Sequence, residues 1–158
     1  MPNVKPIPDG FHSVTPYLTF KDADAAIKFY QKAFGAKETM RLKTPGGGVA
    51  HAEIQIGDSR LMMADENPAY GNKSPQTLGG SPTSYMLYVE DADASFERAV
   101  KAGATVKRPV EDQFYGDRTG TVADPFGYQW SIGTHKQDLT AEEVQRNMEK
   151  MFGAKASA

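Results

Sequence analysis

The stretch DADAAIKFYQKAFGA (residues 22–36) returns further along the chain as DADASFERAVKAGA (residues 91–104). Over residues 22–33 and 91–102, six of twelve positions are identical. Each copy begins with an aspartate that suits a helix N-cap and reaches a glycine that suits a C-cap, Gly35 and Gly103. Apolar residues recur at helical spacing in both copies, which predicts two amphipathic helices that pack on a core. The chain therefore carries an internal repeat built around a helix.

Strand-like segments surround the two predicted helices in the same order. SVTPYLTF (residues 13–20) and SYMLYVE (residues 84–90) precede them, and strand and turn patterns follow each of them. Residues 67–82, between the copies, are rich in Gly, Pro, Asn and Ser and predict a linker loop. The prediction is a flexible segment at 1–10, a βαβββ module at 11–66, the linker at 67–82 and a second βαβββ module at 83–135. One such module buries too little surface to be stable alone, so we expect the two to pack together or against another chain.

A third helix is predicted within the remaining segment, residues 136–158. Thr140 and Glu143 form a capping-box pattern at its start. Val144, Met148, Met151 and Phe152 lie on one side of it. This Met-rich face is expected either to pack on the outside of the domain or to contact a second subunit, and a homodimer is predicted.

Composition excludes several classes of partner. The chain has 158 residues, no cysteine and a formal net charge of −2, with Lys and Arg scattered along its length. The scattered charge argues against nucleic acid, and the lack of cysteine excludes disulfides and zinc–thiolate sites. No apolar run approaches the roughly 20 residues of a membrane span, and the N-terminal residues have no apolar core of the signal-peptide kind. These features predict a cytoplasmic protein that binds neither nucleic acid nor membrane.

His51 and Glu53 are the first candidates for chemistry. They lie two apart in VAHAEIQI (residues 49–56), where apolar and polar residues alternate as in a half-buried strand. They therefore share one face with Gln55, while Ala52, Ile54 and Ile56 share the other. An imidazole beside a carboxylate suits ordinary polar surface, acid/base or ligand contact, or metal binding, and the residues alone leave all three open.

The motifs together resemble the vicinal oxygen chelate superfamily of glyoxalase I, bleomycin-resistance proteins and extradiol dioxygenases. The matching residues are Asp22 followed by Phe29-Tyr30, the run Ala33-Phe34-Gly35-Ala36, and Asp124-Pro125-Phe126-Gly127. TPYLTF, HAEIQIGDSRLMMAD and FYGDRTGTVADPFGYQW are similar to the PhnB-like branch. The resemblance implies an α+β fold in which two βαβββ modules form a curved eight-stranded mixed sheet. Helices would cover the convex face, the concave face would form the binding cleft, and a C-terminal helix would follow.

The resemblance also implies where a family metal would bind, with one His, Gln or Glu ligand from each of four strands. The register places these positions at Thr15, Met63, Ser84 and Ser131. Hydroxyls and a thioether are poor ligands for a hard or borderline divalent cation, and a shift of one residue restores no ligand set. We therefore expect no metal and no other cofactor.

The expected function is binding of a small aromatic or polar organic molecule in the concave cleft. The alternative is a metal-dependent or acid/base lyase, isomerase or dioxygenase of the same superfamily that uses His51 and Glu53. The predicted core includes Val14, Leu18, Phe20, Trp130 and Ile132 as well as the apolar face of residues 49–56. Arg118 is expected either to pair with Asp117 and pin a loop or to anchor an anionic ligand at the rim of the cleft. The residues predicted to contact the ligand are Thr15, Tyr17, Gln55, Met63, Ser84, Met86, Tyr88, Arg118, Gln129 and Ser131.

Overall fold

The computed structural model describes residues 4–156, with side chains as far as Gly153. The first module contains β1 (Tyr17–Phe20), α1 (Ala23–Phe34), β2 (Lys37–Lys43), β3 (Val49–Ile56) and β4 (Ser59–Asp65). The second contains β5 (Ser84–Tyr88), α3 (Ala92–Ala102), β6 (Thr105–Asp112), β7 (Asp117–Ala123) and β8 (Gln129–His135). The linker holds a 3-10 turn (Pro68–Tyr70) and the one-turn helix α2 (Pro75–Leu78), and α4 (Ala141–Ala156) ends the chain. The predicted α+β class and the two βαβββ repeats are confirmed.

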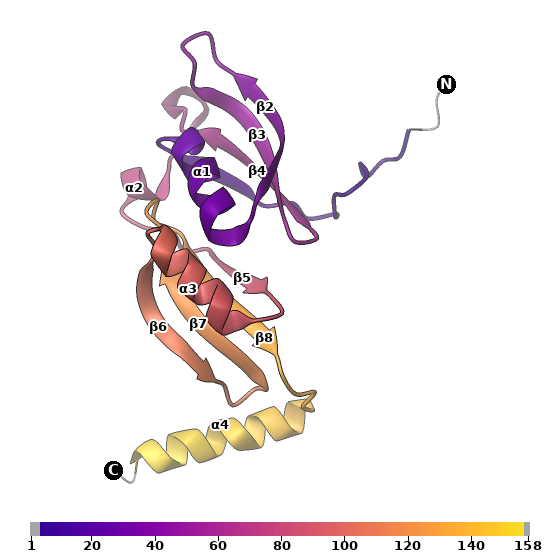
Figure 1. Ribbon diagram of the computed structural model, residues 1–158, viewed down its shortest axis with the longest axis vertical. Coiled ribbons are helices and arrows are strands. Elements are labelled where there is room, and N and C mark those ends of the chain that lie inside the picture. The colour runs from indigo at the N-terminus through magenta and orange to yellow at the C-terminus, as the bar shows by residue number, and fades with distance from the viewer. Residues whose placement is uncertain (1–3, 157–158) are drawn as a thin grey trace.

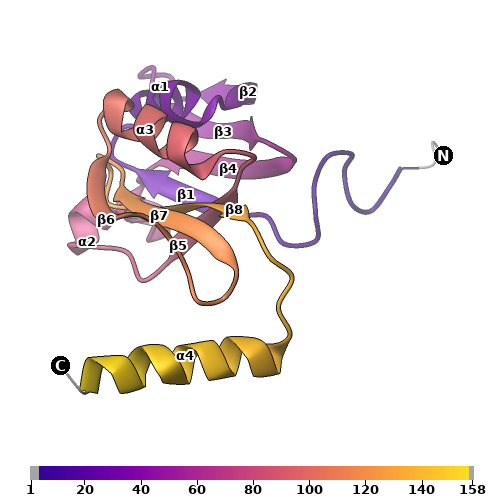
Figure 2. The same ribbon diagram turned by 60° about the horizontal axis from the view of Figure 1, so that its bottom comes forward.

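The eight strands form two four-stranded mixed sheets of the same design (Figure 1). The first sheet has the order β1-β4-β3-β2 and the second β5-β8-β7-β6, so each has one parallel pair and two antiparallel pairs. Helices α1 and α3 lie side by side over the sheets (Figure 2). The opposite surface of each sheet is called its open face below.

The repeated Asp–Gly framework starts and stops the two long helices as predicted. The carboxylate of Asp22 accepts a hydrogen bond from the backbone N–H of Ala25, and that of Asp91 does the same for Ala94. Gly35 takes a left-handed conformation, with φ of 67°, at the end of α1. Arg98 of α3 donates to the backbone carbonyls of residues 31 and 32 at the end of α1. The two modules are thus joined at a helix end whose carbonyls would otherwise lack partners.

A buried polar cluster holds the two modules together within one chain. The Asp124 carboxylate accepts hydrogen bonds from Tyr30 Oη at 2.6 Å and Trp130 Nε1 at 3.0 Å. The Tyr128 hydroxyl contacts both the backbone N–H and the backbone C=O of Thr19 in β1, each at 3.1 Å. Tyr30 and Thr19 belong to the first module, and Asp124, Tyr128 and Trp130 belong to the second. Hydrogen bonds between these two groups therefore connect the modules across their shared core.

The apolar core lies between the sheets and the two long helices. Of the predicted core residues, Leu18, Phe20, Ala52, Ile54, Ile56, Trp130 and Ile132 are buried. Val14 is 85% exposed, so its assignment to the core is wrong. The reason is that β1 begins only at Tyr17, so the alternation of strand faces does not extend back to Val14. Across residues 4–156 no helix is long and apolar enough to cross a membrane.

Candidate functional site

His51 and Glu53 lie on the open face of the first sheet. In β3, Ala52, Ile54 and Ile56 are buried under α1, and His51, Glu53 and Gln55 are partly exposed on the other face. The predicted alternation is therefore confirmed for this strand. Gln55 donates to the backbone carbonyl of Gly57, within its own hairpin, at 3.0 Å.

The imidazole of His51 stands between a phenol and a carboxylate. Tyr17 Oη lies 2.8 Å from His51 Nδ1, and His51 Nε2 lies 3.4 Å from Glu53 Oε1. If the phenol donates its proton to Nδ1, the imidazole N–H is left at Nε2, facing Glu53. Burial raises the pKa of Tyr17, so the phenol keeps its proton more firmly. A phenol, imidazole and carboxylate in line can hold or pass a proton.

Arg60 joins this group from β4 and was missed from the sequence. Its Nη1 lies 3.8 Å from Glu53 Oε2, and the ring of Phe11 lies over its guanidinium, 4.9 Å away. The signal that would have found it is strand parity, because Arg60 shares a face with Met62, the cross-strand partner of both Tyr17 and Glu53.

Two of the predicted ligand contacts on this sheet need correction. Met63 was expected on the open face but is fully buried in the core. The parity assigned to β4 was one residue off, so Met62 takes the open face instead. Thr15 precedes β1, and its hydroxyl donates to the backbone carbonyl of His12.

Arg118 lies on the helix side of the second sheet, away from its open face. It forms a two-pronged ion pair with Asp93 at the start of α3, at 2.7 and 2.8 Å, and contacts Asp112 at 3.3 Å. The pKa of Asp93 is lowered by this guanidinium. The predicted pair with Asp117 is wrong because successive residues of a strand point to opposite faces. Arg118 instead ties the start of α3 to β7, an inner strand of the sheet, and so does not lie at the rim of an open-face cleft.

Asp117 organises a second polar group on the open face of the second sheet. It is buried and accepts hydrogen bonds from Tyr88 Oη at 2.8 Å and His135 Nδ1 at 2.7 Å. The other ring nitrogen of His135 lies 2.9 Å from Asp138. The pKa of His135 is raised, first by Asp138 and then by Asp117. Sequence reasoning missed this group, since His135 and Asp117 meet only through the pairing of β7 with β8.

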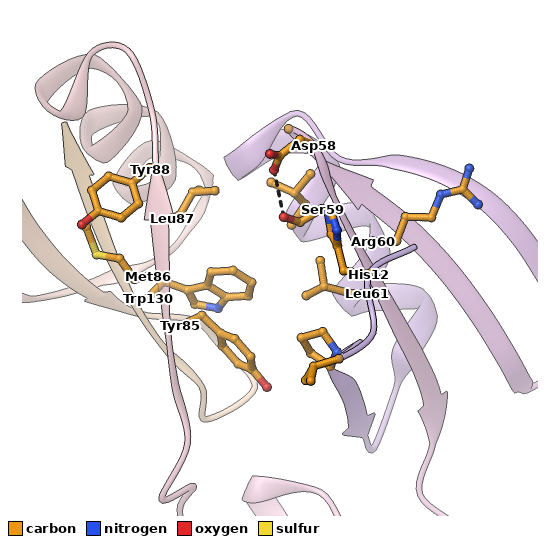
Figure 3. Close-up of a pocket in the computed structure, with 14 residues that line it drawn as sticks. His12, Asp58, Ser59, Arg60, Leu61, Tyr85, Met86, Leu87, Tyr88 and Trp130 are labelled. Atoms are coloured by element: carbon orange, nitrogen blue, oxygen red, sulfur yellow. Dashed lines mark hydrogen bonds between the residues drawn. The ribbon is translucent and has the colours of Figure 1, made fainter. Parts of the chain in front are cut away.

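A cleft of about 570 Å³ separates the two modules (Figure 3). One wall comes from β5 and β8, including the predicted residues Met86 and Tyr88, and the other from the β3–β4 hairpin and the segment before β1. Figure 3 shows Trp130, Leu87 and Tyr85 facing Leu61 across the gap, with the guanidinium of Arg60 turned away at the outer side. The full lining is His12, Val14, Pro16, Ile56, Gly57, Asp58, Ser59, Arg60, Leu61, Tyr85, Met86, Leu87, Tyr88 and Trp130.

The other predicted contacts are dispersed. Ser131 lies in a separate hollow of about 430 Å³ that Met151 of α4 also lines, and its hydroxyl is 3.0 Å from that of Thr121. Ser84 and Gln129 are exposed cross-strand partners at one end of the second sheet, and neither lines the cleft. The structure therefore does not gather the predicted contacts into one cavity.

Comparison with known proteins assigns the family. The family model described as the Glyoxalase/Bleomycin resistance protein/Dioxygenase superfamily matches residues 10–132. The chain belongs to this superfamily. It is 45% identical to protein Rv0887c of Mycobacterium tuberculosis over 139 residues, which cover 86% of this chain and 82% of that protein.

Solved structures with the same arrangement of elements support the fold. TioX from Micromonospora sp. ML1 superposes with a TM-score of 0.62 at 25% identity, over 78% of this chain and 98% of that one. The PhnB protein from Bacillus cereus superposes with a TM-score of 0.60 at 16% identity, over 78% and 99% of the two chains. At that identity the second likeness concerns the fold alone.

The donor set does not fit a metal of the superfamily type. Met63 is buried under α1 and Thr15 precedes its strand, so neither presents a ligand atom on an open face. Their neighbours on the first sheet are a phenol, Tyr17, and a thioether, Met62. Within the part of the chain that the structure describes, no three His, Asp or Glu side chains are grouped so as to hold a metal ion.

Proposed function

We propose that this protein binds a small aromatic organic molecule in the cleft between its two modules, without a metal ion. The observation that carries the proposal is the contrast between the cleft walls. Aromatic and aliphatic side chains of β5 and β8 face a wall whose rim holds the polar residues Asp58, Ser59 and His12. Small-molecule sites are commonly apolar hollows of several hundred Å³ with a few polar groups, and often lie between domains or modules.

The apolar side of the cleft supplies the contact area. Tyr85 lies with its ring 4.8 Å from that of Trp130, centroid to centroid, and burial raises the pKa of Tyr85 to about 12. A phenol that stays neutral leaves this wall uncharged. Tyr88 and Met86 stay substantially exposed at the side of the same strand. A flat ring entering the gap would cover apolar surface and gain offset or edge contacts with these rings.

Trp130 provides a direct test because it is the only tryptophan in the chain and lines the cleft. Titration with a panel of neutral, acidic and basic aromatic molecules should change its fluorescence in a saturable way for at least one member. Tyr88→Ala should weaken that response, whereas Tyr70→Ala, at an exposed position in the linker, should not. A panel that leaves Trp130 unperturbed, or equal responses in both variants, would contradict the proposal.

The Tyr17–His51 contact favours a second candidate, acid/base chemistry on the open face of the first sheet. A phenol at 2.8 Å holds the imidazole in one orientation beside Glu53. Any lyase or isomerase activity found for the protein should fall in both His51→Ala and Glu53→Gln. Full activity in both variants would exclude these residues from the chemistry.

We also propose a homodimer, formed through α4. The helix extends beside the second sheet at one end of the molecule (Figure 2). Its link to the sheet includes a hydrogen bond from Asn147 to the backbone carbonyl of Phe114, and Phe152 is 58% exposed. Light scattering at micromolar concentration should give twice the mass of one chain. The Phe152→Glu substitution should lower the measured mass toward that of a monomer. A monomeric wild-type protein would refute this assignment.

A further inference from the structure

Arg60 differs from the other partly buried arginines in lacking hydrogen-bond partners. Arg41 donates to Asp24 at 2.6 Å and to Glu38 at 2.7 and 3.1 Å. Arg60 reaches only Glu53, at 3.8 Å, which is too long for a hydrogen bond. Among the residues that the structure describes, its Nε is the one buried side-chain nitrogen or oxygen without a hydrogen-bond partner. A guanidinium has five N–H donors, so Arg60 has N–H groups that can still donate to a ligand.

The Glu53 carboxylate, like the Arg60 guanidinium, lacks a hydrogen bond of ordinary length. Its side chain is only 14% exposed, yet its nearest donors are His51 Nε2 at 3.4 Å and Arg60 Nη1 at 3.8 Å. Both distances exceed the ordinary range of about 2.7–3.2 Å for N–H···O bonds. A charged group in a partly buried site that lacks hydrogen bonds is costly in free energy. The space between Arg60 and Glu53 therefore favours a bound group that can accept a hydrogen bond from Arg60 and donate one to Glu53.

The opposite charges of Arg60 and Glu53 determine which chemical class the intervening group can belong to. A carboxylate attracted by Arg60 would also meet the negative charge of Glu53, and an ammonium attracted by Glu53 would meet Arg60. A neutral carboxamide avoids both conflicts, because its C=O accepts from Arg60 while its N–H donates to Glu53. Its donor and acceptor lie side by side, as do the two side chains.

The surroundings of the pair fit an apolar body behind such an amide. Met40 is the cross-strand partner of Glu53, and Leu42 is the partner of His51, so both share this face of the sheet. Met40, Leu42 and Tyr17 are each about half exposed. The ring of Phe11 covers one face of the Arg60 guanidinium, which restricts the plane of its remaining donors.

From this arrangement we propose a second binding site, on the open face of the first sheet, for a neutral molecule bearing a carboxamide. Arg60 and Glu53 pair with the amide, and Tyr17, Met40 and Leu42 contact the apolar part. Arg60 also lines the cleft between the modules, but its guanidinium is turned away from the opposite wall of that cleft, so the amide would bind outside the cleft (Figure 3).

Three probes that share one ring and differ in head-group charge test the site. Benzamide, benzoate and benzylamine are titrated by calorimetry or ligand-observed NMR. Benzamide should bind at least roughly tenfold more tightly than the two ions, because only it meets no like charge. Equal or tighter binding of benzoate or benzylamine, or no binding of benzamide at millimolar concentration, would overturn the proposal.

Charge-neutralising variants should redirect the preference. Glu53→Gln leaves Arg60 uncompensated and should favour benzoate, and Arg60→Gln should favour benzylamine. The matched control is Glu38→Gln, which alters the tightly bonded Arg41 pair on the other face and should keep the preference for benzamide. A variant that failed to fold would lose all binding, so misfolding cannot produce opposite changes of probe preference in the two variants. If both variants still prefer benzamide, the proposed site is contradicted.

Tyr88→Ala separates this site from the cleft. Benzamide should bind this variant as it binds the wild type, since Tyr88 belongs to the second sheet. Loss of benzamide binding in Tyr88→Ala would place the amide in the cleft and refute the open-face assignment. A silent Trp130 in the cleft titration would refute the proposed function alone and leave this result standing.

Discussion

Removing the hydroxyl of Tyr30 tests how strongly the modules are joined. Asp124 is buried and accepts four hydrogen bonds, from Tyr30 Oη, Trp130 Nε1 and the backbone N–H groups of Phe126 and Tyr128. Burial raises the pKa of Asp124, while these donors oppose the rise. Tyr30→Phe keeps the ring in the core and deletes the shortest of the four bonds, 2.6 Å long.

The expected loss follows from the kind of bond removed. A hydrogen bond to a charged group contributes about 1.5–3 kcal/mol to stability. At roughly 2–4 °C per kcal/mol for a chain of this size, the melting temperature should fall by about 3–12 °C. The loss should be largest where Asp124 is ionised. It should shrink as the pH falls through the pKa of Asp124, because a protonated carboxyl needs fewer donors.

Urea denaturation followed by far-UV circular dichroism at several pH values measures the effect. Tyr70→Phe, at a linker position that is 81% exposed, controls for the loss of a hydroxyl as such. A loss below about 0.5 kcal/mol in Tyr30→Phe, or one that grows on acidification, would refute the view that Asp124 depends on this donor.

Three further changes have defined outcomes. Ile54→Ala should destabilise the fold by roughly 2–5 kcal/mol in urea denaturation, whereas His51→Ala on the opposite face should cost less than about 1 kcal/mol. The pKa of His135 is raised above its usual value, chiefly by Asp138, so its stabilisation is present below pH 6.5 and is lost as the pH rises through the raised pKa. Melting curves in that window should show the loss, and Asp138→Asn should reduce it; identical pH profiles would exclude this bridge. Gly116→Ala should destabilise by more than about 1 kcal/mol in the same denaturation assay, because φ is 98° and a Cβ would lie 2.5 Å from a carbonyl oxygen before α4; an unchanged midpoint would show that this turn relaxes.

The features that sequence could predict are those set by local chemistry. Asp22 and Asp91 cap their helices with their own side chains, so the start of each helix is readable without tertiary information. The alternation in residues 49–56 is equally local, because each face of β3 meets one environment along most of its length. The helix pattern that starts at Asp22 returns 69 positions later at Asp91, and with the strand-like segments around each copy this repeat predicted the paired modules.

The failures arise where the position depends on a neighbouring strand. Met63 and Met62 are adjacent methionines, and only the pairing of β4 with β1 and β3 determines which of them faces the helix. The importance of Arg60 is likewise tertiary, since it rests on a distance to Glu53 and on the cover provided by Phe11. Asp117 and His135 lie 18 residues apart and meet only when β7 pairs with β8.

The contact between Tyr128 and Thr19 has a consequence for the solubility of the chain. Strand β1 is at the edge of its sheet, where backbone N–H and C=O groups can template the addition of a foreign strand. The single hydroxyl of Tyr128 occupies both outward-facing backbone groups of Thr19. Thr19 is one of the two residues of this four-residue strand whose backbone groups face outward, so the phenol blocks intermolecular β-pairing at that position. Tyr128→Phe would reopen it and should increase aggregation under conditions in which the fold itself persists.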